Sequence, residues 1–365
     1  MKFISDYRDK ETVDRYLALI SKKATREYII MEVCGGHTMA IHRFGLPQIL
    51  PSNVKLISGP GCPVCVTQKR FIDIAIELSK DPDHVICTFG DLIRVPGSFS
   101  SLEKQKAENS DIIIVYSVME ALNLAITNKN KKIIFLAIGF ETTAPSTAVA
   151  VVRAAELKLK NFFVLPAHKL MPPAMKAIID FGVKIDGYLC PGHVSTITGS
   201  SIYNFIPEKY KLGCVVSGFE PVDILQSIYM LLLQFNDNKP KVEIQYKRAV
   251  TIEGNLKALN FMHTVFEPAD DNWRGIGIIE KSGLKIRPEY AGYDADVQFS
   301  LPEIITIEDK GCICGEILKG LKTPLECPLF NKSCKPENPV GACMVSSEGA
   351  CQAYYKFRLT NQKTF

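Results

Sequence analysis

The chain has 365 residues, of which 47% are hydrophobic and 22% charged, as is typical of a globular protein with two or three domains. Its formal net charge is only +4 and its basic residues are scattered, so nothing favours nucleic-acid binding. The first ten residues carry Asp6, Arg8 and Asp9 and lack the apolar core of a signal peptide, and no apolar run is long enough to span a bilayer. We therefore expect a cytoplasmic protein without membrane contact.

Strands and helices are predicted to alternate along the first two thirds of the chain. Residues 11–23 place apolar side chains at helical spacing, which predicts a helix that packs against a neighbouring domain. Short apolar runs predict strands at residues 28–33, 54–58, 84–89, 111–116, 132–138, 162–165, 185–189 and 212–216. Helices are predicted at residues 66–80, 144–159 and 221–235. A further helix is predicted to follow the strand at residues 111–116 and to end at about residue 127.

Continuously apolar strands that alternate with helices are typical of parallel sheets covered on both faces. We therefore predict an α/β fold with two parallel sheets facing a cleft, one from residues 24–128 and one from residues 129–240. The boundary is placed at the polar stretch of residues 128–132. Residues 241–365 are predicted to form a third region that ends in a Cys-rich lobe. Its elements are expected at residues 242–250, 255–266 and 275–286.

Reactive side chains gather where the predicted strands end. Ligands of open α/β sheets bind beyond the carboxyl ends of the strands. That edge is expected to carry Cys34, His37, Cys62, Cys65, Asp91, Glu141, Thr142, His168, Cys190 and His193. Because reactive side chains are rare at the strand starts, the sequence predicts a functional cleft at this edge.

Twelve cysteines in a reducing compartment indicate metal binding or redox chemistry, because structural disulfides are rare there. In Cys34-Gly-Gly-His37 the thiol is a candidate nucleophile or metal ligand, with the histidine as base or supporting partner. The alternative is a structural histidine beside an unrelated thiol. In Cys62-Pro-Val-Cys65 a strand-to-helix turn predicts that the helix dipole lowers a thiol pKa. That pair could cycle with a disulfide, bind a metal, or be inert and buried.

A third motif, Gly139-Phe-Glu141-Thr-Thr143, places a carboxylate and two hydroxyls at a helix N-terminus. Helix capping accounts for the threonines without any function. Glu141 is a candidate for positioning ligands or moving protons. Lone histidines such as His168 and His193 are more often structural than metal ligands. The sequence has no glycine-rich nucleotide-binding motif, which weighs against a nucleotide cofactor.

Beyond residue 309 the chain is rich in Cys, Gly and Pro. The last four cysteines follow the pattern C-x6-C-x8-C-x7-C, at Cys327, Cys334, Cys343 and Cys351. Four thiolates suit either tetrahedral zinc or a [4Fe-4S] cluster, and the wide spacing favours the cluster. A ligand from Cys312 or Cys314 remains an open alternative.

These motifs together resemble the HypD family of [NiFe]-hydrogenase maturation factors. The resemblance rests on Cys34-Gly-Gly-His-Thr, Gly59-Pro-Gly-Cys-Pro-Val-Cys65, Gly139-Phe-Glu-Thr-Thr143 and the ending Pro339-Val-Gly-Ala-Cys-Met-Val-Ser-Ser-Glu-Gly-Ala-Cys-Gln-Ala-Tyr-Tyr355, and it extends over nearly the whole chain. It implies two Rossmann-like α/β domains and a lobe with a [4Fe-4S] cluster on the last four cysteines. It also implies Cys34 as the iron-binding thiol and Cys62 with Cys65 as a redox pair.

The resemblance further implies a scaffold on which the Fe(CN)2CO unit is assembled together with the small chaperone HypC, with cyanide delivered by HypE. It implies a monomer outside such complexes, and a scaffold rather than an enzyme with its own turnover. We hypothesise that the cluster reduces the Cys62/Cys65 disulfide and that this dithiol supports ligand attachment to iron on Cys34. Two alternatives are a thiol-disulfide oxidoreductase of ferredoxin-thioredoxin reductase type and a zinc-stabilised interaction module.

Overall fold

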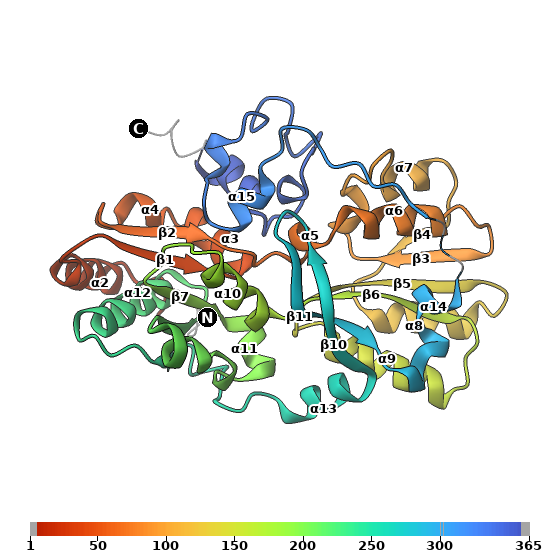
Figure 1. The fold of residues 1–365 in the computed structure, drawn as a ribbon, viewed down its shortest axis with the longest axis horizontal. Helices are drawn as coiled ribbons and strands as arrows, with labels where there is room; N and C mark the ends of the chain where they lie inside the picture. Colours follow the sequence, from red (N-terminus) through yellow and green to blue (C-terminus); the bar gives the residue numbers. More distant parts are fainter. Residues whose placement is uncertain (1–5, 300, 302, 359–365) are drawn as a thin grey trace.

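The computed structural model describes residues 6–299, 301 and 303–358. Two parallel sheets with flanking helices lie side by side, and a small lobe sits over their junction (Figure 1). The first sheet has the strand order β2 (Val54–Ser58), β1 (Tyr28–Glu32), β7 (Gly187–Pro191), β8 (Gly213–Ser217), β9 (Val242–Ile244). The second has the order β4 (Ile112–Ile114), β3 (His84–Thr88), β5 (Lys132–Gly139), β6 (Phe162–His168). The predicted α/β class is confirmed.

The division of strands between the two sheets differs from the prediction. The chain leaves the first sheet after β2, builds the whole second sheet, and returns to the first at β7, which pairs with β1. The predicted split of the strands at residues 128 and 129 is therefore wrong. The polar stretch there is only a surface connection between α8 (Val118–Thr127) and β5, inside the second sheet. Local polarity marks a loop but does not reveal which strands pair.

An antiparallel hairpin, β10 (Phe266–Trp273) and β11 (Gly277–Ile286), runs from the second sheet towards the lobe (Figure 1). The sequence predicted only its second strand, because the exposed positions of β10 carry Pro268, Asp270 and Asn272, which are uncommon in strands. The longer helices are α2 (Lys10–Lys23), α3 (Gly35–Arg43), α6 (Lys69–Leu78), α8, α9 (Ala144–Glu156), α10 (Met171–Asp180), α11 (Gly192–Thr198), α12 (Pro221–Asn236) and α13 (Leu256–Val265). The predicted helix over residues 11–23 is confirmed as α2, which packs on α12.

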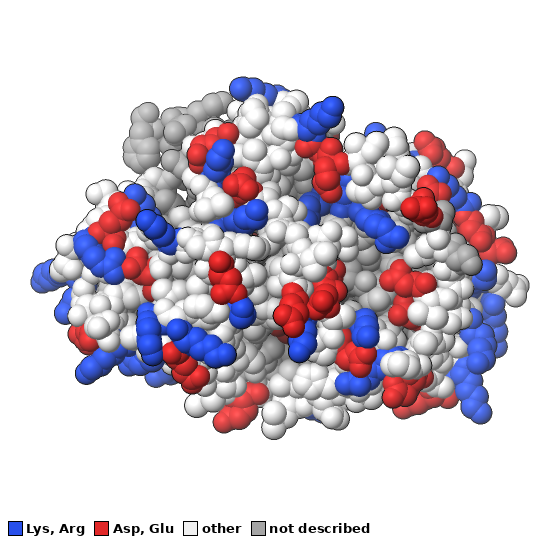
Figure 2. Space-filling view, in the orientation of Figure 1, with Lys and Arg blue, Asp and Glu red and all other residues white. Residues whose placement is uncertain are grey.

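Shorter turns complete the fold. The short α-helices are α4 (Leu46–Ile49), α5 (Pro63–Val66), α7 (Leu102–Ala107), α14 (Ala295–Gln298), α15 (Cys314–Leu318) and α16 (Ala350–Ala353). The remaining helical turns are η1 (Leu92–Arg94), η2 (Ser201–Tyr203), η3 (Ile206–Tyr210), η4 (Pro288–Tyr293), η5 (Pro324–Glu326), η6 (Ala342–Met344) and η7 (Tyr354–Arg358). No helix within the described residues is long and apolar enough to cross a membrane. Acidic and basic side chains are interspersed on the face shown in Figure 2.

The core runs through both sheets. Seven of the eight residues of β5 are buried, and every residue of β3, β7 and β8 is buried. This is expected for parallel strands that are covered on both faces. One apolar cluster continues from the second sheet through α5 into the lobe. The carboxyl ends of both sheets therefore meet at α5, the short helix that contains Cys65.

Candidate functional site

Cys34 and Cys62 lie at adjacent strand ends in the first sheet. Cys34 follows β1 and precedes α3, whereas Cys62 follows β2 and precedes α5. The loop between them is in direct contact with Cys34, since a Cβ atom at Gly61 would lie 2.3 Å from the Cys34 nitrogen. Gly35 N–H also donates to Gly61 O at 3.0 Å. Glycine is required at position 61 because the two backbones touch, and the fold thus brings the two thiol motifs to one rim.

The buried carboxyl group of Glu32 is hydrogen-bonded to the backbone of Cys34. The Cys34 N–H donates to Glu32 Oε2 at 3.2 Å, and the Thr38 hydroxyl donates to Glu32 Oε1 at 2.5 Å. Burial raises the pKa of Glu32 to about 8, so the group is protonated at neutral pH. Sequence reasoning missed this residue, although a glutamate inside an otherwise apolar strand was the available signal.

His37 is held as one tautomer. Its Nε2 lies 3.0 Å from Gly218 O and 3.2 Å from Ser217 O, and since carbonyls only accept, Nε2 carries the proton. Burial lowers the pKa of His37 to about 4, so the ring is neutral. Its Nδ1 is buried and has no hydrogen-bond partner among the described residues. The ring therefore offers a free acceptor, and it stacks on Phe219 at 4.6 Å between centroids.

Glu348 covers Cys34 from the lobe. A Cβ atom at Gly35 would lie 2.4 Å from Glu348 Cβ, so the glycine permits this close approach. Burial and the Glu348 charge raise the pKa of the Cys34 thiol to about 12. Cys34 therefore carries a thiol proton at neutral pH, and a bound metal ion would have to displace it. Glu348 was not among the candidates from sequence, because nothing local marks it.

A cavity of about 410 Å³ lies beside this site. Gly36 and Glu348 form part of its wall next to Cys34. The other lining residues are Arg8, Met39, Ala40, Arg43, Phe44, His193, Phe219, Glu220, Tyr246 and Arg248. Of these, His193 stacks on Phe219 at 4.0 Å, on which His37 also stacks. The predicted residue His193 thus reaches the site through a stack of rings.

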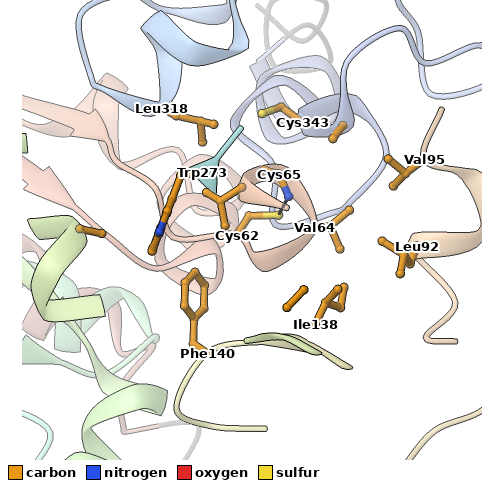
Figure 3. Close-up of a cluster of buried hydrophobic side chains, with 14 of the residues drawn as sticks. Cys62, Val64, Cys65, Leu92, Val95, Ile138, Phe140, Trp273, Leu318 and Cys343 are labelled. Atoms are coloured by element: carbon orange, nitrogen blue, oxygen red, sulfur yellow. Dashed lines mark hydrogen bonds between the residues drawn. The ribbon is translucent and has the colours of Figure 1, made fainter. Parts of the chain in front are cut away.

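Cys62 and Cys65 are close to one another and fully enclosed. The Cys65 N–H lies 3.3 Å from Cys62 Sγ, an interaction drawn as a dashed line in Figure 3. At Cys65 the predicted lowering of a thiol pKa is wrong. Burial raises the pKa of Cys65, and the neighbouring Cys343 and Cys62 thiols raise it further. The helix α5 is a single turn, so its dipole is too small to offset these effects.

Cys343 connects this pair to the lobe. Its thiol is hydrogen-bonded to both Cys314 and Cys65, and these two contacts lower its pKa to about 6. Figure 3 shows Cys343 in the lobe above Cys62 and Cys65. A pKa of about 6 makes Cys343 largely a thiolate at neutral pH. The sulfur atoms therefore form a continuous path from the lobe to the Cys62/Cys65 pair.

The lobe contains a cavity lined mainly by thiols. Its cysteines are Cys312, Cys314, Cys327, Cys334 and Cys351. Three of the four predicted cluster ligands are thus present, whereas Cys343 turns towards Cys65 instead. Sulfur donors with apolar neighbours fit a [4Fe-4S] cluster, and Val340 N–H lies 3.4 Å from Cys334 Sγ, as amides do around such sulfurs. Among residues 6–299, 301 and 303–358 no group of three ligand-type side chains is arranged for a single metal ion.

The remaining candidates lie elsewhere. Glu141 Oε1 accepts from Met171 N–H at 2.9 Å, and burial raises the Glu141 pKa to about 7. Phe140, the residue before Glu141, belongs to the same buried hydrophobic cluster as Cys62, and its ring lies 6.1 Å from that of Trp273 (Figure 3). Asp91 accepts from the Ser346 hydroxyl at 2.7 Å and so contacts the lobe.

Three further residues that were predicted at the strand ends have no described contact with Cys34, Cys62 or Cys65. His168 is fully buried beside the Phe266 ring, 5.5 Å between centroids. Cys190 is fully buried in β7 of the first sheet, where its Sγ lies 4.0 Å from Tyr188 O. Thr142, by contrast, is exposed.

Comparison with known proteins agrees over nearly the whole length. Residues 11–358 match the model of the HypD family, described as the hydrogenase formation hypA family. The chain is 46% identical over 367 residues to the hydrogenase maturation factor HypD of Azotobacter vinelandii, covering 98% of this chain and 97% of that protein. It is 43% identical over 369 residues to HypD of Escherichia coli, covering 98% of each. For HypD of Cupriavidus necator the figures are 44% over 368 residues, 98% and 97%.

Proposed function

Since the chain belongs to the HypD family and is a hydrogenase maturation factor, we propose that it is the scaffold on which the Fe(CN)2CO unit of a [NiFe] hydrogenase is assembled. The observation that carries this proposal is the line of sulfur atoms. It begins in the lobe cavity, passes through Cys314 and Cys343 to Cys65 and Cys62, and ends beside Cys34. Such a line serves chemistry that requires both electrons and a thiol ligand.

Cys34 is the proposed attachment point for the iron cargo. Thiolate sulfur is the soft donor that iron with cyanide and carbon monoxide ligands requires. The free Nδ1 of His37 would accept a hydrogen bond from a group bound beside Cys34. Glu348 would close the site from the lobe side. No described contact links Glu141 to this centre, and its proposed part is limited to fixing the start of α10.

Partners would reach Cys34 through the neighbouring cavity. At about 410 Å³, with arginine, glutamate and aromatic walls, it has room for a segment of another protein. We assign it to a HypC-type chaperone that shares the iron and to a HypE-type cyanide donor, as the family resemblance implies. The remaining iron ligands then come from outside this chain.

A thiol exchange follows from the contacts. The Cys343 thiolate attacks the Cys65 sulfur of a Cys62–Cys65 disulfide, and Cys62 leaves with the bonding pair and takes up a proton. Cys314 then attacks Cys343 in the mixed disulfide, which frees Cys65. Two electrons have moved, so the Cys62/Cys65 pair is reduced and a Cys314–Cys343 disulfide has formed.

This exchange also divides the lobe cysteines by role. With Cys314 and Cys343 in the exchange, four thiols are left to hold a [4Fe-4S] cluster, namely Cys312, Cys327, Cys334 and Cys351. When bound, the cluster would relay two electrons, one at a time, from an external one-electron reductant, and with the uptake of two protons the Cys314–Cys343 disulfide would return to two thiols. In this proposed set of cluster ligands, Cys312 takes the place of Cys343, which the spacing of the cysteines had predicted as a ligand.

The test compares a Cys34→Ala variant with the parent, each purified anaerobically with its partner. We expect loss of the infrared bands of bound cyanide and carbon monoxide, with the visible absorption of the cluster retained. Cys87→Ala, a buried thiol within β3, is the matched control and should keep the bands. Retention of the bands in Cys34→Ala would remove Cys34 as the attachment point, whereas their absence from the parent complex would favour the thiol-disulfide oxidoreductase instead.

A further inference from the structure

The turn of the β10–β11 hairpin lies against the Cys62/Cys65 helix. Trp273 forms an antiparallel bridge with Thr67, directly beyond α5. Arg274 N–H donates to Val66 O at 2.9 Å, and Arg274 Nε donates to Thr67 O at 2.8 Å. Val66 and Thr67 follow Cys65 immediately, so the hairpin turn holds the backbone that carries this thiol.

The same turn touches the lobe next to its exchange thiol. A Cβ atom at Gly315 would lie 2.3 Å from Gly275 O, and one at Gly275 would lie 2.4 Å from Gly315 Cα. The two backbones are therefore in contact, with no room for a side chain on either residue. Gly315 follows Cys314 in α15. One turn thus contacts both chain segments that carry the exchanging thiols.

The hairpin is itself fixed to the second sheet. Lys169, at the end of β6, is buried and pairs with Asp271, and its Nζ lies 3.1 Å from Asn272 O. Trp273 Nε1 donates to Ser282 Oγ at 2.8 Å across the hairpin, where both side chains are fully buried. Buried, satisfied polar contacts of this kind hold an element in one position.

Resting on the proposed thiol exchange, we infer that Gly275 and Gly315 are positioning residues for it. Their backbone contact fixes how closely the lobe approaches α5. At this separation Cys343 reaches Cys65 on one side and Cys314 on the other. A side chain at either glycine would force the lobe away from α5 and open the gap that Cys343 must span.

The experiment measures one bond of the exchange. In a Cys62→Ser/Cys314→Ser background, glutathione disulfide oxidises Cys65 and Cys343 to a disulfide and is itself reduced to two glutathione molecules. The rate measured is that of the closure step, in which the Cys343 thiolate displaces glutathione from a Cys65–glutathione mixed disulfide. It is followed by mass spectrometry of the glutathionylated and linked peptides from the anaerobically purified full chain. Adding Gly315→Ala should slow this step by about tenfold or more, because displacements of about 1 Å have effects of that size. Alanine is a good helix former, so α15 itself is retained.

Two further variants separate contact from strain. Gly275→Ala changes the same contact from the hairpin side and should also slow formation of the Cys65–Cys343 disulfide. Gly277 shares the left-handed backbone, with φ +107 against +70 at Gly275, but a Cβ there would meet nothing within 4 Å. Gly277→Ala should therefore keep the rate within about twofold, since it adds backbone strain alone.

The outcomes distinguish the two levels of the proposal. If the background protein forms no Cys65–Cys343 disulfide, the thiol exchange itself is refuted. If it does, and both Gly315→Ala and Gly275→Ala match it, the positioning role is refuted while the exchange stands. Equal slowing by Gly277→Ala would assign the effect to hairpin strain and would likewise refute the contact.

Discussion

Burial decides the charge of almost every titratable group around Cys34. It keeps Glu32 protonated, His37 neutral and the Cys34 thiol intact, each by raising or lowering a pKa against the charged form. Cys343 is the exception, because hydrogen bonds from Cys314 and Cys65 favour its thiolate. The site thus holds a neutral carboxyl at Glu32 and a neutral ring at His37 near the proposed iron position, and one reactive thiolate at Cys343 within the line of sulfur atoms.

The Glu32 carboxyl should make stability depend on pH. Its folded pKa of about 8 exceeds the ordinary value of 4.5, so the unfolded chain loses this proton first as pH rises. The stability contributed by the group is complete below pH 4.5 and is lost up to about pH 8, at no more than about 1.4 kcal/mol per pH unit. Glu32→Gln should remove this slope, as measured by urea unfolding between pH 5 and 8. Glu156→Gln, on an exposed ion pair, should leave it unchanged.

At the scale of elements, periodicity predicted most strands within a few residues, since a short apolar run bounded by turn residues strongly favours a buried strand. It failed where a tertiary contact outweighs local preference. The helix α3 begins with Gly35-Gly36, which on propensity alone indicates a loop. There the glycines are needed because Gly35 lies under Glu348 and Gly36 lies against Phe219. The hairpin strand β10 was missed for the different reason that its exposed positions carry residues uncommon in strands.

The hairpin should depend on the hydrogen bond across it. Ser282→Ala leaves the buried Trp273 N–H without its acceptor, which should lower the free energy of unfolding by about 1–3 kcal/mol. Adding Trp273→Phe removes the donor as well, so the double variant should lose less than the sum of the two single losses. Ser146→Ala, at an exposed hydroxyl, is the control for loss of a serine. Strict additivity in a denaturant-based cycle would contradict the coupling.

At the scale of the whole molecule, the sequence placed Cys34, Cys62 and Cys65 at strand ends and Cys343 in the Cys-rich lobe, but it could not show which thiols meet. Cys65 and Cys343 are far apart in the chain, and their contact exists only because the lobe sits on both sheets. Spacing therefore assigned Cys343 to the cluster ligands, whereas the fold turns it towards α5. The strand division failed for the same reason, since it depends on β7 returning to β1.

The docking of the lobe on the second sheet should depend on Arg94. Its guanidinium lies 3.3 Å from Pro336 O and 3.2 Å from Val345 O, and Val345 is close to Cys343 in sequence. Arg94→Met keeps the aliphatic stem but removes both charged hydrogen bonds, each worth about 1.5–3 kcal/mol. We expect hydrogen exchange across residues 341–349 to become faster by about tenfold or more, because local opening is governed by such contacts.

The same opening should expose the sulfur line. Cys65 and Cys343 are fully buried, so a maleimide reaches them only when the lobe lifts from α5, and Arg94→Met should therefore accelerate their labelling in parallel with hydrogen exchange. Arg153→Met removes an exposed arginine of α9 whose ion pair among the described residues is with Glu156 of the same helix, and it should change neither rate. If Arg94→Met accelerated neither process, the lobe would be held by its contacts with Cys34 and α3, and the thiol exchange would be independent of the second sheet.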